Sequence, residues 1–313
     1  MIKQIAVIGA GTMGHGVAHT FARHGYKVNL YDSFSASLES APKKMKNELQ
    51  FMVDEDYITC EEMERALNNI KLSGDLAESV QTADYVIEAI PERIDLKKEL
   101  FASLDAYCPA HTVFASNTSS LKLGDIVADL PEERKKHCMI SHWYNPAYLI
   151  PIVELSKFGN MDEDVFQDVY NLYVNSGKKP VCVCKDIPGM IANRLLHALA
   201  REAFHLVEIG AGSPEDIDNA MKFGPCFRSA TTGILEVVDL GGVDIWLAGE
   251  DNILPALDNS DKACDMLRNL AKEGRMGVKN GKGFFEYPGD RAAEVQDAFF
   301  KRLVIQLKAS AHY

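Results

Sequence analysis

The sequence has 313 residues, of which 47% are hydrophobic and 25% charged, as expected for a globular protein of one large domain or two unequal ones. Its formal net charge of -12, from 33 basic and 45 acidic residues, argues against nucleic acid or an acidic membrane surface as a partner. The longest apolar stretches are interrupted by glycine, histidine or charged residues, so we expect no membrane-spanning segment.

The first 185 residues alternate between strand-like and helix-like segments. A β-branched run at 5–8 is followed by glycines, a helical stretch at 15–24 and a second strand at 27–31. Charged residues at helical spacing predict one or two surface helices over 35–66, joined near 54–56. Further strands are expected, with helices between them, at 85–88, 112–115, 138–141, 150–155 and 180–184. This alternation predicts an α/β fold with a doubly wound, mostly parallel sheet covered on both faces.

The pattern changes at 186–189, where the sequence Asp-Ile-Pro-Gly interrupts the alternation. After it the chain is expected to be nearly all helix, with segments at 190–209, 214–222, 233–240 and 291–308. Ser213 is a typical N-cap, since a proline and two acidic residues follow it. We therefore expect an α/β domain over residues 1–185 and an all-α domain over residues 186–313.

Seven scattered cysteines favour reduced thiols over a disulfide framework, because their number is odd. The one close pair, Cys182 and Cys184, would face the same side of a strand. No group of histidines and cysteines has metal-ligand spacing, so no metal is expected. These observations favour a cytoplasmic protein.

A glycine-rich turn, G-x-G-x-x-G, lies between the first expected strand and the first expected helix. The first glycine permits the tight turn, the second allows the backbone to approach a pyrophosphate, and the third lets the helix pack closely on the strand. Free N–H groups at the helix start would face the phosphates. The expected cofactor contacts in the turn are Gly9, Gly11, Thr12, Met13 and Gly14. The alternative is a purely structural turn.

Asp32 ends the second expected strand, where a carboxylate can accept hydrogen bonds from the adenosine ribose. It would repel the 2′-phosphate of NADP, and its neighbours Tyr31 and Ser33 supply no compensating cation. The sequence therefore predicts NAD as the cofactor. The alternative is a solvated residue at a strand end.

A polar run at 116–121 and the residue His142 each follow an expected strand, at the edge where parallel sheets bind ligands. The step from Asn145 to Pro146 imposes an extended or turn geometry, so the returning chain could bring Glu154 beside His142. A carboxylate orients an imidazole and stabilises its protonated form, which suits acid/base chemistry on an alcohol. Taken singly, a histidine is more often structural, and Glu154 would more often be an exposed strand residue.

The motifs follow one another in a defined order. They are Gly9-x-Gly11-x-x-Gly14, Ser116-Asn117-Thr118-Ser119-Ser120, His142-x-x-Asn145-Pro146, Glu154, the segment 188–194 and Gly281-Lys282-Gly283-Phe284. From Ile5 to about Tyr287 this set resembles the 3-hydroxyacyl-CoA dehydrogenase family. The resemblance implies a Rossmann-type NAD-binding domain at 1–185 and, at 186–313, a helical substrate-binding domain that forms a homodimer.

The resemblance also implies roles for single residues. His142 would be the acid/base and Glu154 its orienting partner, while Ser119 and Asn193 would contact the reacting oxygen or the neighbouring carbonyl. Besides the glycine turn and Asp32, the implied cofactor contacts are Glu92, Lys97, Ser119, Asn145 and Lys279. The implied reaction interconverts an (S)-3-hydroxyacyl-CoA, of short chain such as 3-hydroxybutyryl-CoA, and its 3-ketoacyl-CoA.

Other features favour a different substrate. Trp143 and Tyr144 stand where many acyl-CoA members carry two phenylalanines. The segments 148–151 and 223–228 resemble a subgroup that acts on small free acids and includes L-gulonate dehydrogenase and carnitine dehydrogenase. A third alternative is a non-catalytic structural protein of the lens-crystallin kind.

The two enzyme hypotheses predict different positions for the positive charge that binds the anionic substrate. Lys43, Lys44 and Lys46 on a surface helix could hold the phosphates of CoA, unless they are only a solvated helix face. A free acid would instead need a cation such as Arg228. The acyl-CoA hypothesis is favoured, because the Asn-Thr-Ser-Ser run and the Gly-Lys-Gly-Phe segment resemble the acyl-CoA members of the family more closely.

Overall fold

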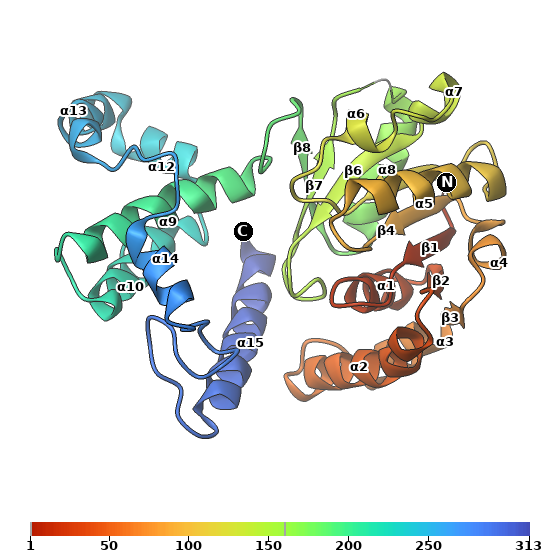
Figure 1. The fold of residues 1–313 in the computed structure, drawn as a ribbon, viewed down its shortest axis with the longest axis horizontal. Coiled ribbons are helices and arrows are strands. Elements are labelled where there is room, and N and C mark those ends of the chain that lie inside the picture. Colours follow the sequence, from red (N-terminus) through yellow and green to blue (C-terminus); the bar gives the residue numbers. More distant parts are fainter. Residues whose placement is uncertain (1, 160) are drawn as a thin grey trace. The chain divides into compact units, whose positions relative to one another are not determined.

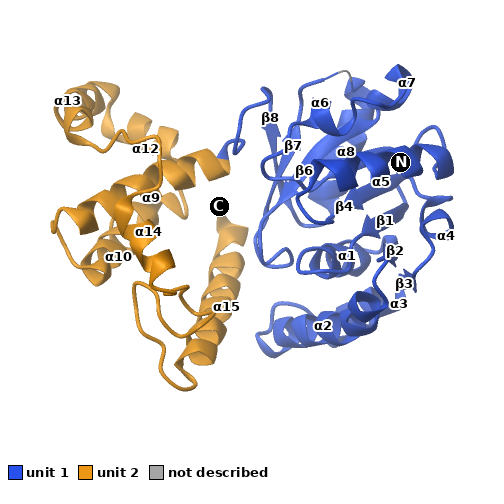
Figure 2. Ribbon diagram, viewed as in Figure 1, with its two compact units in different colours: residues 1–191 blue, residues 192–313 orange. Residues whose placement is uncertain are grey.

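The computed structural model describes every residue except Met1 and Asn160. The chain forms two compact units, residues 1–191 and residues 192–313, here called the N-terminal and the C-terminal unit (Figure 2). The division follows Ile191, a few residues beyond the change of pattern at 186–189.

The N-terminal unit is built on one eight-stranded sheet with the strand order β3-β2-β1-β4-β5-β6-β7-β8 (Figure 1). Its strands are β1 (Gln4–Ile8), β2 (Lys27–Tyr31), β3 (Ile70–Ser73), β4 (Tyr85–Glu88), β5 (Val113–Ser116), β6 (Cys138–Trp143), β7 (Ile152–Ser156) and β8 (Lys179–Val183). All neighbouring strands are parallel except β6 and β7, which are antiparallel. The predicted doubly wound, mostly parallel sheet is confirmed. The edge strand β3 was not predicted, since four residues of mixed polarity give little periodicity.

Eight helices connect these strands within the described part of the unit. They are α1 (Gly14–Arg23), α2 (Ser35–Asp54), α3 (Cys60–Asn68), α4 (Leu76–Val80), α5 (Ile94–Tyr107), α6 (Leu123–Ile126), α7 (Glu132–Lys135) and α8 (Glu163–Asn175). The predicted break near residues 54–56 is confirmed, and Asp56 there has a positive φ of 52°. The side chain of Thr59 caps α3, with Glu62 completing a capping box.

Helices cover both faces of the sheet, because successive strand residues point to opposite sides. On β4, Val86 belongs to a buried cluster with Phe101 of α5. Its neighbour Tyr85 packs instead against Phe21 of α1 and Tyr173 of α8, with ring centroids 6.3 and 6.2 Å apart. The central strands β1, β4, β5 and β6 are therefore buried between two layers of helices, whereas the outer strands β3 and β8 are partly exposed.

The C-terminal unit is helical, as predicted. It contains α9 (Ala192–Glu208), α10 (Pro214–Phe223), α11 (Pro225–Ser229), α12 (Ile234–Gly241), α13 (Val243–Ile253), α14 (Asp265–Lys272) and α15 (Arg291–Ala309). The predicted cap at Ser213 is confirmed, and it forms a capping box with Asp216. Phe284 of the Gly-Lys-Gly-Phe segment stacks on Phe204 of α9, with ring centroids 5.9 Å apart.

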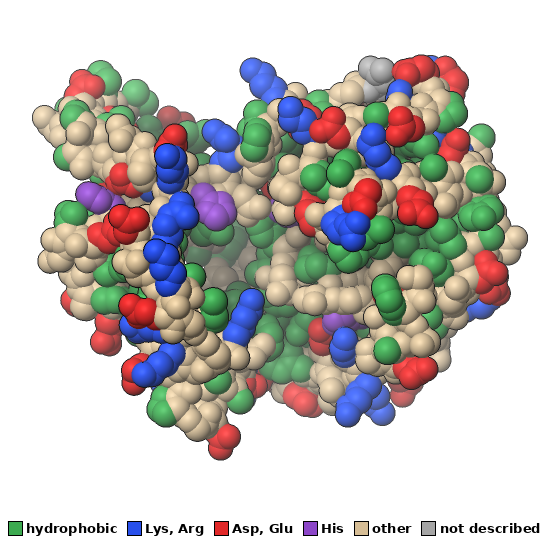
Figure 3. All heavy atoms as spheres, viewed as in Figure 1, with side chains coloured by type: hydrophobic (Ala, Val, Ile, Leu, Met, Phe, Trp, Pro, Cys, Tyr) green, Lys and Arg blue, Asp and Glu red, His purple; other side chains and the backbone are tan. Residues whose placement is uncertain are grey.

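Among the described residues, no helix combines the length and apolar character needed to cross a membrane, and no group of side chains could hold a metal ion. All seven cysteines are free. Acidic and basic side chains are interspersed over the face of the N-terminal unit drawn in Figure 3.

Candidate active site

The residues singled out from the sequence of the N-terminal unit gather at one edge of its sheet. The parallel strands β1, β4 and β5 end there at the glycine turn, Glu88 and Ser116, and β6 ends one residue after His142. Because parallel strands share one carboxyl edge, four segments distant in sequence meet at this edge.

The three glycines of the turn have different physical reasons to be glycine. A Cβ on Gly9, which has a φ of 103°, would lie 2.8 Å from the Ala89 carbonyl oxygen, and one on Gly14 would lie 1.6 Å from that of Gly9. A Cβ on Gly11, in contrast, would meet no atom within 4 Å. The fold therefore requires Gly9 and Gly14, whereas Gly11 leaves open a space beside the backbone, which suits a close pyrophosphate.

Asp32 lies directly after β2 and supports the turn. Its Oδ2 accepts a hydrogen bond of 2.8 Å from the Ala10 N–H, and its Oδ1 accepts one of 2.9 Å from the Phe34 N–H. Carboxylate oxygens have further lone pairs, so these two bonds orient the group and still leave acceptor capacity for a ribose. Glycine turn and carboxylate together fit the adenosine diphosphate part of NAD.

His142 and Glu154 face each other across the antiparallel strands β6 and β7. His142 Nδ1 lies 3.0 Å from Glu154 Oε2, and both side chains are buried. The same Oε2 accepts a 3.0 Å bond from the Tyr144 hydroxyl, and Oε1 accepts a 2.9 Å bond from the Ile191 N–H. A carboxylate is an acceptor only, so Nδ1 carries the proton and Nε2 stays available as acid or base.

Tyr144 and Asn117 were not proposed as site residues from the sequence. Residues two apart on an extended segment face the same side, so a hydroxyl at Tyr144 could have been placed beside Glu154 once the pair with His142 was proposed. The Asn117 side chain accepts a 2.7 Å bond from the Trp143 N–H and ties the end of β5 to that of β6. No sequence pattern predicts this contact.

Lys178 holds the loop that joins His142 to Glu154. Its Nζ donates to the carbonyl oxygens of Ala147 and Ile150, at 2.5 and 2.8 Å, and lies 4.4 Å from the centre of the Trp143 ring. Burial lowers the pKa of Lys178 to about 7. The loop geometry thus depends on one buried amine that no sequence pattern singles out.

A second charged network supports the polar run after β5. Lys97 Nζ lies 2.5 Å from Glu88 Oε1 and 3.3 Å from Glu92 Oε2, and only 1% of its side chain is exposed. Glu92 Oε1 accepts bonds from the backbone N–H groups of Ser119 and Ser120, both at 3.1 Å.

The charge of Glu92 is stabilised by this network. Burial would raise the pKa of Glu92, but hydrogen bonds from Thr118 and Ser120 and the charge of Lys97 outweigh it and lower the pKa. Glu92 therefore fixes the loop that presents the exposed Ser119. Lys97 lies beneath that loop and bonds two carboxylates.

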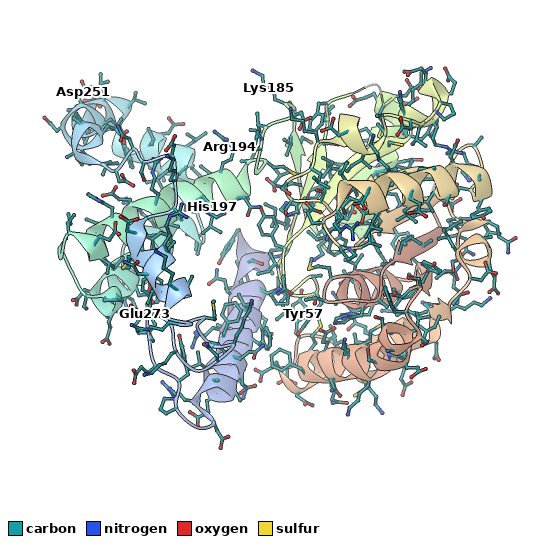
Figure 4. All side chains as sticks on the ribbon, in the orientation of Figure 1. Tyr57, Lys185, Arg194, His197, Asp251 and Glu273 are labelled. Carbon is teal, nitrogen blue, oxygen red and sulfur yellow. The ribbon has the colours of Figure 1, made fainter. Side chains whose placement is uncertain are left out.

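The remaining expected site residues lie on the loop after β6 or in the C-terminal unit. Asn145 is exposed and precedes a cis peptide bond to Pro146. Asn193 and the exposed Lys279 belong to the C-terminal unit, Asn193 in the first turn of α9 beside Arg194, which Figure 4 labels. The N-terminal unit thus brings together the glycine turn, Asp32, the His142 pair and the Ser119 loop.

Comparison with known proteins identifies the family. The 3-hydroxyacyl-CoA dehydrogenase NAD-binding domain matches residues 4–187, and the C-terminal domain of the same family matches residues 189–287. The chain belongs to the 3-hydroxyacyl-CoA dehydrogenase family. It is an NAD-dependent dehydrogenase, which confirms the cofactor and the enzyme class expected from the sequence.

Relatives of this dehydrogenase differ in what their names say they act on. A probable 3-hydroxybutyryl-CoA dehydrogenase of Bacillus subtilis is 37% identical over 287 residues, 91% of this chain and 98% of that protein. The 5-formyl-3-hydroxy-2-methylpyridine 4-carboxylate 5-dehydrogenase of Mesorhizobium japonicum is 31% identical over 304 residues, 97% of both proteins. A crystal structure of a dehydrogenase described by that activity, 30% identical, superposes with a TM-score of 0.89 and covers 97% of both chains.

Proposed function

We propose that this dehydrogenase interconverts an (S)-3-hydroxyacyl-CoA, of short chain such as 3-hydroxybutyryl-CoA, and the corresponding 3-ketoacyl-CoA. The observation that carries the chemistry is the His142 imidazole, held by Glu154 at Nδ1 with Nε2 unbonded among the described residues. An imidazole held in this way can take a proton from an alcohol. It lies at the same edge of the sheet as the glycine turn.

His142 is the acid/base in this proposal, and Glu154 orients it. In oxidation Nε2 removes the 3-hydroxyl proton, and Glu154 stabilises the imidazolium that forms. In reduction the same proton returns to the 3-keto oxygen. Hydride transfer to and from C3 is the chemistry that bound NAD would supply. Ser119 and Asn193 would contact the reacting oxygen or the neighbouring carbonyl.

We propose the cofactor contacts that the sequence predicts, except that the role of Lys97 is indirect. The glycine turn would hold the pyrophosphate and Asp32 the adenosine ribose, while Asn145 and Lys279 would contact the dinucleotide at the surface. Lys97 bonds Glu88 and Glu92, so we propose that it acts on the cofactor through Glu92 rather than directly.

The proposed thioester substrate is supported by a lysine patch on α2. Lys43, Lys44 and Lys46 are all exposed, while Met45 between them is buried, so the three ammonium groups can reach phosphates of CoA. Acetoacetyl-CoA should be reduced with NADH much faster than free acetoacetate. Changing the three lysines to alanine should raise KM for the thioester about threefold to tenfold with little change in kcat, since remote phosphate contacts are mostly uniform binding.

A matched control uses lysines at the opposite edge of the sheet. Lys135 and Lys136 precede β6 and pair with Glu132 and Glu133, at 2.7 and 2.8 Å, so their replacement by alanine should leave KM unchanged. A thioester that is not turned over at all would contradict the acyl-CoA proposal.

A small free hydroxy acid is the second candidate, because Arg228 offers a charge for a carboxylate. Arg228 is exposed on α11, and no acidic side chain among the described residues pairs with it. The Mesorhizobium relative named above acts on a pyridine carboxylate, according to its name. Turnover of L-gulonate or carnitine that is lost in Arg228→Ala would favour this candidate. A protein with neither activity would fit the crystallin-like alternative.

We also propose a homodimer formed through the C-terminal unit, in the cytoplasm. Hydrophobic side chains along α9 are largely exposed within one chain, among them Leu195, Leu196 and Leu199 at 58%, 56% and 51%. A second copy could cover such a surface. Phe204 and Leu206, also expected there, are half-buried. Light scattering at micromolar concentration should give twice the chain mass, and the monomer mass would contradict the proposal.

A further inference from the structure

His15 occupies the first turn of α1, directly after the last glycine of the turn, and is nearly buried. Its Nδ1 lies 2.5 Å from the carbonyl oxygen of Gly11, and its Nε2 lies 3.0 Å from Oε1 of Glu48 on α2. The other Glu48 oxygen lies 3.1 Å from Nε2 of His19, one turn further along α1. These contacts link the backbone of the glycine turn to an ionisable cluster that the proposed dehydrogenase chemistry does not use.

The hydrogen-bond partners define where the protons are. A carbonyl oxygen only accepts, so His15 Nδ1 carries a proton; with an ionised Glu48, Nε2 carries one as well, and His15 is an imidazolium. His19 is fully buried, its Nδ1 has no partner among the described residues, and its Nε2 donates to Glu48. This arrangement corresponds to a neutral His19, an anionic Glu48 and a cationic His15.

The pKa shifts have the directions that this assignment needs. Burial lowers the pKa of His19. Burial would lower the pKa of His15 too, but the hydrogen bond and charge of Glu48, with the bond to Gly11, raise it above its ordinary value. Burial would raise the pKa of Glu48, but the bonds from His15 and His19 lower it. Besides these groups, Lys44 on α2 lowers the His15 pKa by its charge, and the Tyr148 ring packs on His19.

We propose that His15 is a cofactor-binding residue whose imidazolium supplies positive charge to the pyrophosphate at the glycine turn, so that dinucleotide binding weakens as His15 loses its proton. The bond to Gly11 also fixes the peptide between Gly11 and Thr12. Because a trans peptide is planar, the Thr12 N–H points away from His15, and no described residue accepts from it. The same contact therefore fixes the direction of a backbone donor in the turn that has no partner among the described residues.

The pH dependence follows from the charge of the cluster. With His15 protonated, the cluster of His15, Glu48 and His19 is neutral, and its positive end adjoins the turn. Once His15 loses its proton, the cluster carries the net negative charge of Glu48 beside a ligand that is itself anionic. Affinity should therefore be highest below the folded pKa of His15 and fall as the pH rises through it. Binding in that range should take up protons.

This inference rests on the proposal that the glycine turn holds the pyrophosphate, and its test separates the two. ADP-ribose carries the pyrophosphate but no nicotinamide, so its binding does not involve His142. Calorimetric titration of the whole protein from about pH 6 to 9 should show the Kd for ADP-ribose rising about threefold to tenfold with pH, with proton uptake near the midpoint. His15→Gln, which keeps a donor for Gly11 but no titrating charge, should bind at the weaker level throughout.

Two further variants sharpen the test. Glu48→Gln removes the carboxylate that raises the His15 pKa, so the midpoint should move to lower pH. His24 is the matched control, because its Nδ1 also contacts a carbonyl four residues back, Thr20 at 2.9 Å, but at the far end of α1. His24→Gln should keep the wild-type profile, and circular dichroism should confirm that each variant is folded.

The outcomes are distinct. A pH dependence that persists in folded His15→Gln, or a flat profile in the wild-type protein, would overturn the role of His15 alone. Absence of ADP-ribose binding at every pH would overturn the glycine turn as the pyrophosphate site, and the role of His15 with it.

Discussion

The two units differ in how much of their hydrophobic surface is buried. In the N-terminal unit, nearly every hydrophobic side chain of β1, β4 and β5 is buried. In residues 192–313, all of which the structure describes, the buried hydrophobic side chains are Val237 and Val304. Leu235 and Leu240 of α12 are 79% and 78% exposed. A sheet covered on both faces completes its own core, while a set of amphipathic helices has apolar stripes that something else must cover. The N-terminal unit therefore has a closed hydrophobic core, whereas the C-terminal unit has exposed apolar surface that could bind another molecule.

The first prediction tests whether the N-terminal unit carries the proposed acid/base. His142→Ala should lower kcat by about 10² to 10⁴, the range for a positioned general acid or base, while NADH binding hardly changes. Glu154→Gln should lower kcat less, through loss of imidazole orientation. Asn193→Ala, from the C-terminal unit, should act mainly on KM. Steady-state kinetics with NADH would check all three, and near-normal kcat in His142→Ala would eliminate the proposed mechanism.

The second prediction compares one leucine from each unit. Leu104 of α5 is fully buried, so Leu104→Ala should lower the free energy of unfolding by about 2 to 5 kcal/mol. Leu235→Ala should change it by less than about 0.5 kcal/mol at low protein concentration. If a dimer covers Leu235, the cost of that change should grow with concentration, because association stabilises the folded state. Urea unfolding at two protein concentrations measures the change in unfolding free energy for each variant. Equal changes for the two leucines would contradict the difference in burial between the units.

The third prediction uses the buried amine of the N-terminal unit. The folded pKa of Lys178, about 7, lies below its ordinary value of 10.5, so between these values the unfolded chain binds more protons. Lys178 should therefore make the folded state more stable as pH rises from 7 towards 10, by up to about 1.4 kcal/mol per pH unit. Lys178→Met should remove this contribution, and the difference in unfolding free energy between the two proteins isolates it. A difference that does not vary with pH would contradict the assignment.

The smallest effect concerns selection of the cofactor by the N-terminal unit. NADH should be used about tenfold or more better than NADPH, because Asp32 would face the additional phosphate at close range. Asp32→Ser combined with Ser33→Arg should narrow that preference, as measured by kcat/KM for each cofactor. Lys279→Ala, from the C-terminal unit, should weaken both cofactors alike. Equal use of NADH and NADPH by the unaltered protein would count against the role given to Asp32.

Local chemistry allowed several features of the candidate site to be predicted from the sequence. The glycine turn needs specific residues in consecutive positions, so its place between a strand and a helix could be recognised directly. The cap at Ser213 and the break near Asp56 are local for the same reason. The pairing of His142 with Glu154 could be proposed because a short return of the chain separates them, and the register of β6 and β7 confirms their contact.

Other features depend on which elements pack together and become visible only in the three-dimensional structure. Residues 33 apart in sequence, His15 and Glu48, meet because α1 lies against α2, and no local periodicity encodes that meeting. The same holds for two buried lysines, Lys97 beside Glu92 and Lys178 beneath the loop after His142. A buried ammonium group needs hydrogen-bond partners, and these can come from any segment that packs against it. The fold class and the NAD cofactor could thus be predicted from the sequence and His142 proposed as the acid/base, whereas the charged networks around these segments arise only when the elements pack together.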